Sequence, residues 1–146
     1  MQVFLPYPDL EQSVRCLDPD RLGNQVYREA ISLLRGGWRH HPAAKLWTSY
    51  KPALAQYCIY GLRELIKRNS RPPTHILLLH EFKRYMHNKP ITLPPFIGNI
   101  DFHISHQDNL IFKYPLYYAP IFNRPIPLTK PDYIWPLHQL TQGQTK

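Results

Sequence analysis

A single glutamate, Glu29, stands among arginines in the stretch DPDRLGNQVYREAISLLRGGW. Arg21, Arg28 and Arg35 are spaced seven residues apart, so on a helix they form one stripe. Guanidinium groups in such a row suit the phosphates of a nucleic-acid backbone. Glu29 falls instead at the border of the apolar face, one turn beyond Gln25, where a carboxylate can act as an acid and a base.

Each of these features also has a purely structural interpretation. The arginine stripe can be a solvated basic face without a ligand. Glu29 can form a salt bridge with Arg21, with Arg28 or with a residue on another helix. Residue types and spacing leave both interpretations open.

A second group able to do chemistry is the string DFHISHQDN, which contains Asp101, His103, His106 and Asp108. On a helix His103 and His106 share one face, a spacing that can ligate zinc or another divalent cation. The string is not accompanied by an HExxH pattern, cysteine pairs or a dense carboxylate cluster. A metal-dependent nuclease or phosphohydrolase is therefore an alternative class, although surface and DNA-contact roles are more common for such histidines.

Proline and glycine mark the elements that must position these residues. Asp18 can cap a helix that has Pro19 at its first position, and two glycines follow Arg35, which predicts a helix near residues 19–35. Further helices are predicted around HPAAKLWTSY, from Pro52 for about 17 residues as the spine of the core, and over THILLLHEFKRYMHN with Thr74 as its cap. KPITLPPFIGN is expected to be a loop, and a short helix is expected in FHISHQDNLIFKY.

The remaining third of the chain is rich in Pro and Tyr and shows no sustained period. We predict that this third is irregular but packed, and that about residues 139–146 are flexible. No convincing alternation of polar and apolar residues indicates a strand. The expected fold class is therefore mainly α, a compact helical protein with one domain over residues 1–146.

The composition favours an anionic partner. The chain has 146 residues and a formal net charge of +8, from 18 Lys and Arg against 10 Asp and Glu, which suits nucleic acid. The two cysteines, Cys16 and Cys58, imply no disulfide framework. We recognise no secretory signal and no membrane-spanning run, and we expect a cytoplasmic protein that does not bind membranes.

Four strings carry a family resemblance: LPYPDLEQSVRCLDPDRLGNQVYRE, GWRHHPAAKLW, HISHQDNL and YIWP. They resemble a bacterial and phage branch of the pyrimidine-dimer DNA glycosylases, the UV endonucleases of the phage endonuclease V type. The resemblance spans most of the chain and is strongest in residues 3–60 and 101–136. The archetypal phage enzyme shares mainly the triplet Tyr27, Arg28 and Glu29.

The resemblance implies a compact helical enzyme that binds UV-damaged double-stranded DNA, cleaves the glycosidic bond at a pyrimidine dimer and then nicks the abasic strand, with no cofactor and no metal. In that family the chain's own α-amino group forms a Schiff base with the sugar, and the glutamate of the triplet assists proton transfers. These roles fall on Met1 and Glu29. An α-amino group suits this chemistry because its reference pKa is about 7.8, against about 10.4 for a lysine.

This chain departs from the archetype at its start. Gln2 is a large side chain that normally leaves the initiator methionine in place, so the amine belongs to Met1. Val3 stands where the archetype has a basic residue nearby. We expect a monomer in the cytoplasm of a bacterium or a phage-infected host, associated with the nucleoid.

DNA contacts are expected from polar side chains in the resembling strings. They are Arg21, Gln25, Arg28, Arg39, His40, His41, His103, His106, Gln107 and Asn109. His41 precedes Pro42 and is therefore extended, so it can contact a phosphate or sugar or can be a structural cap. Surfaces for stacking a base, most of which we expect in the core, are Trp38, Trp47, Tyr114, Tyr117, Tyr118 and Phe122.

Three other functions remain open from the sequence. One is a glycosylase or AP lyase for another modified base, and one is the metal-dependent nuclease that would use His103 and His106. The third is a noncatalytic DNA-binding protein, whose binding would depend strongly on salt and for which Glu29 would be dispensable.

Overall fold

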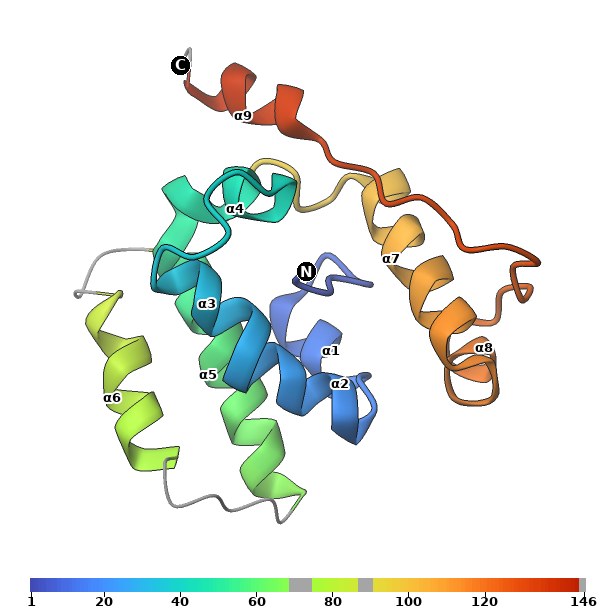
Figure 1. Ribbon diagram of the computed structural model, residues 1–146, viewed down its shortest axis with the longest axis horizontal. Helices are drawn as coiled ribbons and strands as arrows, with labels where there is room; N and C mark the ends of the chain where they lie inside the picture. Colours follow the sequence, from blue (N-terminus) through green and yellow to red (C-terminus); the bar gives the residue numbers. More distant parts are fainter. Residues whose placement is uncertain (69–74, 87–90, 145–146) are drawn as a thin grey trace.

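The computed structural model describes residues 1–68, 75–86 and 91–144, with the backbone alone described for 141–144. The elements in chain order are α1 Leu10–Arg15, α2 Pro19–Asn24, the π-helix η1 Gln25–Glu29, α3 Ala30–Leu34, α4 Pro42–Trp47, the 3-10 helix η2 Thr48–Tyr50, α5 Lys51–Lys67, α6 His75–Arg84, α7 Ile100–Lys113, α8 Pro115–Phe122 and α9 Leu137–Gln144 (Figure 1). Within these ranges there is no strand, and the mainly α class is confirmed. None of the described helices is long and apolar enough to cross a bilayer.

The elements α2, η1 and α3 follow one another without a break, as the predicted helix near residues 19–35 requires. The Asp18 carboxylate accepts a hydrogen bond from the backbone N–H of Arg21 at the start of α2, and Pro19 occupies the first turn. Gly36, with a φ of 86°, follows the last turn, where the left-handed conformation favours glycine. The sequence signals for this helix are thus confirmed at both ends.

The middle of this helix is a π turn, which the sequence did not predict. The N–H of Ala30 donates to the carbonyl of Gln25, five residues back rather than four. The turn therefore contains one extra residue, and it carries the triplet that ends in Glu29. Single π turns inside helices occur often at functional sites.

Helix α5 is the spine of the core, as predicted. It packs against α1, against the helix formed by α2, η1 and α3, and against α6. Gly61 of α5 permits a close approach to η1, because a Cβ at that position would lie 2.7 Å from Cγ2 of Val26. The absence of a side chain at Gly61 therefore allows the short distance between α5 and η1.

The C-terminal third is more regular than predicted. Helix α7 has 14 residues rather than being short, and α8 and α9 lie in the part predicted to be irregular. Helix α8 was not predicted because its residues are apolar on nearly every side and include Pro120. The chain between α8 and α9 is irregular, and helical backbone continues to Gln144.

Two other predictions concern the region around α6. The helix itself lies within THILLLHEFKRYMHN, as predicted, and residues 91–99 form turns and loop. The predicted cap Thr74 lies outside the described residues.

Candidate active site around Met1 and Glu29

The first seven residues form a nonhelical segment that is largely buried, and side chains from neighbouring helices bind its backbone. Gln25 of η1 accepts from the N–H of Phe4 (3.0 Å) and donates to the carbonyl of Gln2 (2.9 Å). The hydroxyl of Tyr57 on α5 donates to the carbonyl of Phe4 (2.8 Å). The terminal residues of a domain are usually poorly ordered, so an N-terminal segment bound by buried side chains is unusual and suggests a function for it.

Helix α7 holds the other side of the segment with three side chains. His106 Nδ1 accepts from the N–H of Leu5 (2.8 Å), and His103 Nδ1 bonds to the carbonyl of Leu5 (2.7 Å). Gln107 Nε2 donates to the carbonyl of Pro6 (2.8 Å). The polar groups of this buried backbone are therefore satisfied by side chains in place of a sheet or helix.

The two histidines are neutral in the fold because they are buried. Burial lowers the pKa of His103, and burial together with the nearby His103 lowers the pKa of His106 to about 3. His103 Nε2 accepts from the N–H of Gly98 (2.9 Å), so both nitrogens of this ring are engaged. Each ring is thus a structural acceptor or donor for backbone.

These contacts concern several of the predicted DNA contacts. The side chains of Gln25, His103, His106 and Asn109 are buried, and the Gln107 amide donates to Pro6, so contact with DNA stays a prediction for these residues. His103 and His106 also do not offer a free ligand pair, since they hold Leu5. Among the described residues no three His, Cys, Asp or Glu side chains are grouped so as to hold a metal ion.

The Met1 amine and Glu29 both act on His41. Burial lowers the pKa of His41, the positive charge of the amine lowers it further, and the negative charge of Glu29 opposes both. His41 is therefore within electrostatic reach of the amine and of Glu29. His41 Nδ1 accepts from the N–H of Ala43 (3.0 Å) at the start of α4, so the interpretation of His41 as a structural cap is confirmed.

Glu29 itself lines a pocket of about 320 Å³. The other lining residues are Phe4, Asp20, Arg21, Asn24, Gln25 and Lys113. Burial, and then the positive charges of Lys130 and Arg21, lower the pKa of Lys113, while Glu29 raises it. The carboxylate of Glu29 thus faces cationic groups from both sides of the pocket, α2 and α7, as a site for a phosphodiester requires.

The predicted arginine stripe is divided. Arg35 makes two hydrogen bonds of 2.8 Å to Glu81 of α6, whereas Arg21 lines the Glu29 pocket and also pairs with Asp18 (3.3 Å). Helices α6 and α7 lie on opposite sides of α3 (Figure 1). The extra residue of the π turn lies between Arg21 and Arg35, so the seven-residue spacing no longer aligns them. Arg28 is exposed.

Aromatic rings from the C-terminal string YIWP complete the surroundings of the site. The His41 ring lies 5.6 Å from that of Trp135, centre to centre, and Trp135 lies 5.7 Å from Tyr133. Burial raises the pKa of Tyr133 to about 12, with Glu29 adding to the effect and Arg21 opposing it. Trp38 has a φ of 58° and is 56% exposed, and its ring lies 6.0 Å from that of His41.

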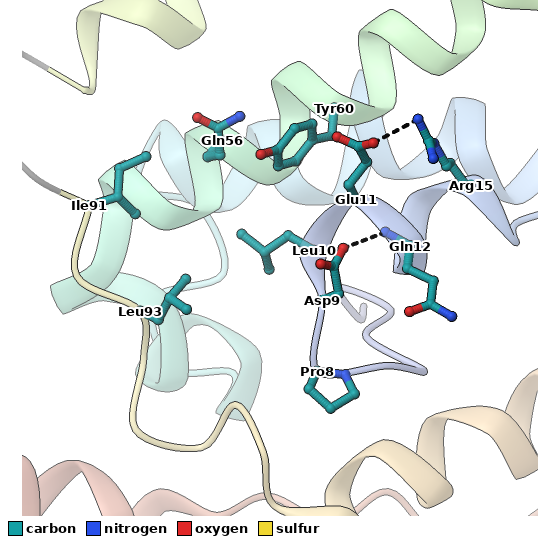
Figure 2. A pocket seen from close by; sticks show the side chains of 10 residues that line it. All are labelled: Pro8, Asp9, Leu10, Glu11, Gln12, Arg15, Gln56, Tyr60, Ile91 and Leu93. Atoms are coloured by element: carbon teal, nitrogen blue, oxygen red, sulfur yellow. Dashed lines mark hydrogen bonds and ion pairs between the residues drawn. The ribbon is translucent and has the colours of Figure 1, made fainter.

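A larger pocket of about 700 Å³ lies elsewhere, between α1, α5 and residues 91–93 (Figure 2). Its charged side chains are engaged: Glu11 pairs with Arg15 (2.7 Å), and Asp9 accepts from the N–H of Gln12 (2.8 Å). Neither Met1 nor Glu29 lines it. A large volume alone does not indicate a catalytic site, so we place the candidate active site at the smaller, basic pocket.

A comparison with protein-family models matches residues 1–77 to the pyrimidine dimer DNA glycosylases. The chain belongs to the pyrimidine dimer DNA glycosylase family. Comparisons with curated proteins and with solved structures found no match. The matched residues contain the held N-terminal segment, Glu29 and His41, which confirms the family recognised from the sequence.

As a pyrimidine dimer DNA glycosylase, the protein acts on DNA, and its basic pocket suits that substrate. Sequence reasoning missed Asn24, Lys113 and Lys130 near the pocket. Asn24 was one turn from Glu29 and could have been found from helical spacing. Lys113 reaches the pocket, and Lys130 comes near Lys113, only through tertiary folding. The YIWP string was noticed only as a resemblance; its Trp135 lies beside His41, and its Tyr133 lies near Phe4 of the pocket.

Several of the stacking candidates are core residues, as expected for most of them. Trp47 is 1% exposed and packs against Phe96, and the buried Tyr118 hydrogen bonds to both the N–H and the carboxylate of Asp18. Trp38 and Tyr114 are exposed and remain available to a ligand.

Proposed function

We propose that this DNA glycosylase cleaves the glycosidic bond at UV pyrimidine dimers in double-stranded DNA and then nicks the strand as an AP lyase. The nucleophile is the α-amino group of Met1, and Glu29 transfers protons. One observation carries the proposal: buried side chains hold the N-terminal segment, and its amine and Glu29 both act electrostatically on His41. A loose terminus would lose this orientation, which is a large part of nucleophilic catalysis.

The chemistry follows from these groups. The neutral amine attacks C1′ of the nucleotide, the bond from C1′ to the base nitrogen breaks, and the base leaves with that electron pair and takes up a proton. Transfer of the amine proton and opening of the sugar ring then give the Schiff base between Met1 and C1′. Removal of a C2′ proton expels the 3′ phosphate and nicks the strand, and water releases the amine.

Glu29 suits the proton transfers in this sequence. As a carboxylate it can accept a proton from the attacking amine or from C2′, and as an acid it can protonate the ring oxygen as the ring opens. Arg21 and Lys113, which line the same pocket, hold the phosphates on either side of the lesion. The exposed Arg28, Arg39 and His40 extend this contact along the backbone.

Borohydride trapping tests the nucleophile. The protein is incubated in EDTA with borohydride and with UV-irradiated, abasic or undamaged duplex, and any covalent adduct is mapped to a peptide. We expect an adduct on Met1 with the first two duplexes and none with undamaged DNA, and protein acetylated at the α-amine should give none. Trapping with abasic DNA alone would reduce the activity to the lyase step. An adduct on a lysine, or nicking that needs a divalent cation, would overturn the proposal.

The pocket is built from one chain, so we also propose that a monomer is sufficient for activity. DNA of the nucleoid is the proposed target. Titration of a labelled duplex followed by size-exclusion chromatography with light scattering checks the first point, because a 1:1 complex is expected.

A further inference from the structure

The loop between α8 and α9 carries an apolar side chain that is almost fully exposed in the described part of the protein. Leu128 is 98% exposed and lies in a bend formed by Leu128 and Thr129. Ile126, two residues earlier, is 54% exposed. Single exposed leucines are common on protein surfaces, so a functional role for Leu128 must be argued from its position.

The loop is braced at both ends and stiffened between them. Arg124 forms a two-pronged ion pair with Asp108 of α7 (2.9 and 3.2 Å). The N–H of Ile134 donates to Ser105 Oγ, also on α7 (3.3 Å). Prolines at 125, 127 and 131 fix the backbone φ at three positions around the bend. The loop that carries Leu128 is therefore rigid, and it holds the Leu128 side chain in solvent.

The loop lies beside the Glu29 pocket. The ring of Tyr133 in this loop is 6.4 Å, centre to centre, from that of Phe4, which lines the pocket. In addition, Lys130 acts electrostatically on Lys113, which lines the same pocket. Leu128 is two residues from Lys130, a distance of roughly 7 Å along an extended chain. The apolar side chain thus stands next to cations that suit a DNA backbone.

We propose that Leu128 is a wedge that enters the duplex between base pairs next to the lesion bound at the Glu29 pocket. Proteins that kink DNA insert apolar side chains in this way, and an enzyme acting on a stacked base must first open the stack. The proposal rests on the proposed function for the lesion in the pocket. The cationic surroundings favour DNA over a protein partner, for which an apolar patch without cations would be expected.

The test compares Leu128→Ala and Leu128→Phe with a matched control, Leu116→Ala, whose side chain on α8 is 88% exposed. Each protein is assayed under single-turnover conditions on a UV-dimer duplex and by borohydride trapping on an abasic single strand, which has no base pairs to separate. In a third assay 2-aminopurine next to the dimer reports unstacking by its fluorescence.

We expect Leu128→Ala to slow cleavage of the duplex by about tenfold or more and to abolish the rise in fluorescence. Its trapping on the single strand should match the wild type, and Leu128→Phe and Leu116→Ala should behave as the wild type throughout. Wild-type rates for Leu128→Ala on the duplex would overturn the wedge, as would an equal loss on both substrates. If the wild type neither cleaves nor traps, the proposed function fails, and the fluorescence of bound duplex still decides for or against the wedge.

Discussion

Glu29 shows how much of a residue's chemistry depends on partners that are distant in the sequence. Glu29 acts electrostatically on His41 and Lys113, and the second of these follows it by 84 positions. The sequence predicted Glu29 and Met1 through a motif and a resemblance. It could not predict Lys113, because no local pattern marks a lysine at the end of one helix as the partner of a carboxylate on another.

Replacing Glu29 by Gln keeps the shape of the side chain and removes its ability to carry a proton. We expect Glu29→Gln to lower the single-turnover rate of strand cleavage by about 10²- to 10⁴-fold, the usual contribution of a positioned acid or base. Binding of damaged duplex, measured by fluorescence anisotropy, should be retained or slightly stronger. Glu11→Gln removes a charge that does not line this pocket and is the control. Full activity of Glu29→Gln would show that Glu29 carries no proton in the reaction.

His106 links stability to pH. The unfolded chain protonates this ring near pH 6.5, whereas burial lowers its pKa in the fold to about 3. Between these values the unfolded state binds the extra proton, so the free energy of unfolding falls as the pH falls. From this ring alone we expect a loss of roughly 2 kcal/mol between pH 7 and pH 5, measured by urea unfolding. An imidazole NMR signal of His106 that titrates near pH 6.5 would contradict this.

Among the helices, capping residues and prolines predicted the helix ends well, whereas the periodicity of apolar side chains predicted the presence of helices less well. Asp18, Pro19 and the glycines fixed the ends of the helix that carries Glu29 because these residues act on local backbone. The π turn was not predictable in this way, since it depends on how η1 packs on α5. Helix α8 was missed because its residues are apolar on nearly every side, which leaves no period to detect.

The packing of α5 on η1 gives a prediction at this scale. In Gly61→Ala the new methyl group would meet Val26 of the π turn, and we expect a loss of about 1–3 kcal/mol in the free energy of unfolding. Displacement of η1 should also slow strand cleavage beyond what the remaining folded fraction explains.

Gly23→Ala is the matched control for that variant. A Cβ at Gly23 has no neighbour closer than 3.9 Å, so alanine there should be neutral or stabilising, by up to about 1 kcal/mol. Chemical unfolding of both variants at pH 7 checks the pair. Equal stability of Gly61→Ala and the wild type would show that the helices move apart without cost.

At the scale of the whole molecule, the net charge of +8 gives DNA binding a strong dependence on salt. Lys113 contributes where the lesion binds, so Lys113→Gln should weaken binding and reduce the slope of log K against log salt by about 1. Lys67→Gln, at the end of α5, carries the same change of charge away from the pocket and should leave the slope nearly unchanged. Anisotropy titrations at several salt concentrations measure both slopes, and identical slopes would exclude Lys113 from the phosphate contacts.

The held N-terminal segment also sets an order of events during synthesis. This segment leaves the ribosome well before α7, because the side chains that bind Leu5 and Pro6 follow about 100 residues later. Helices α1 to α5 can form from nearer contacts, whereas closing this long loop must wait for α7. The segment is therefore held in place only after α7 has been made. A nascent chain released before α7 would carry the Met1 amine and Glu29 without the geometry that lets them act together.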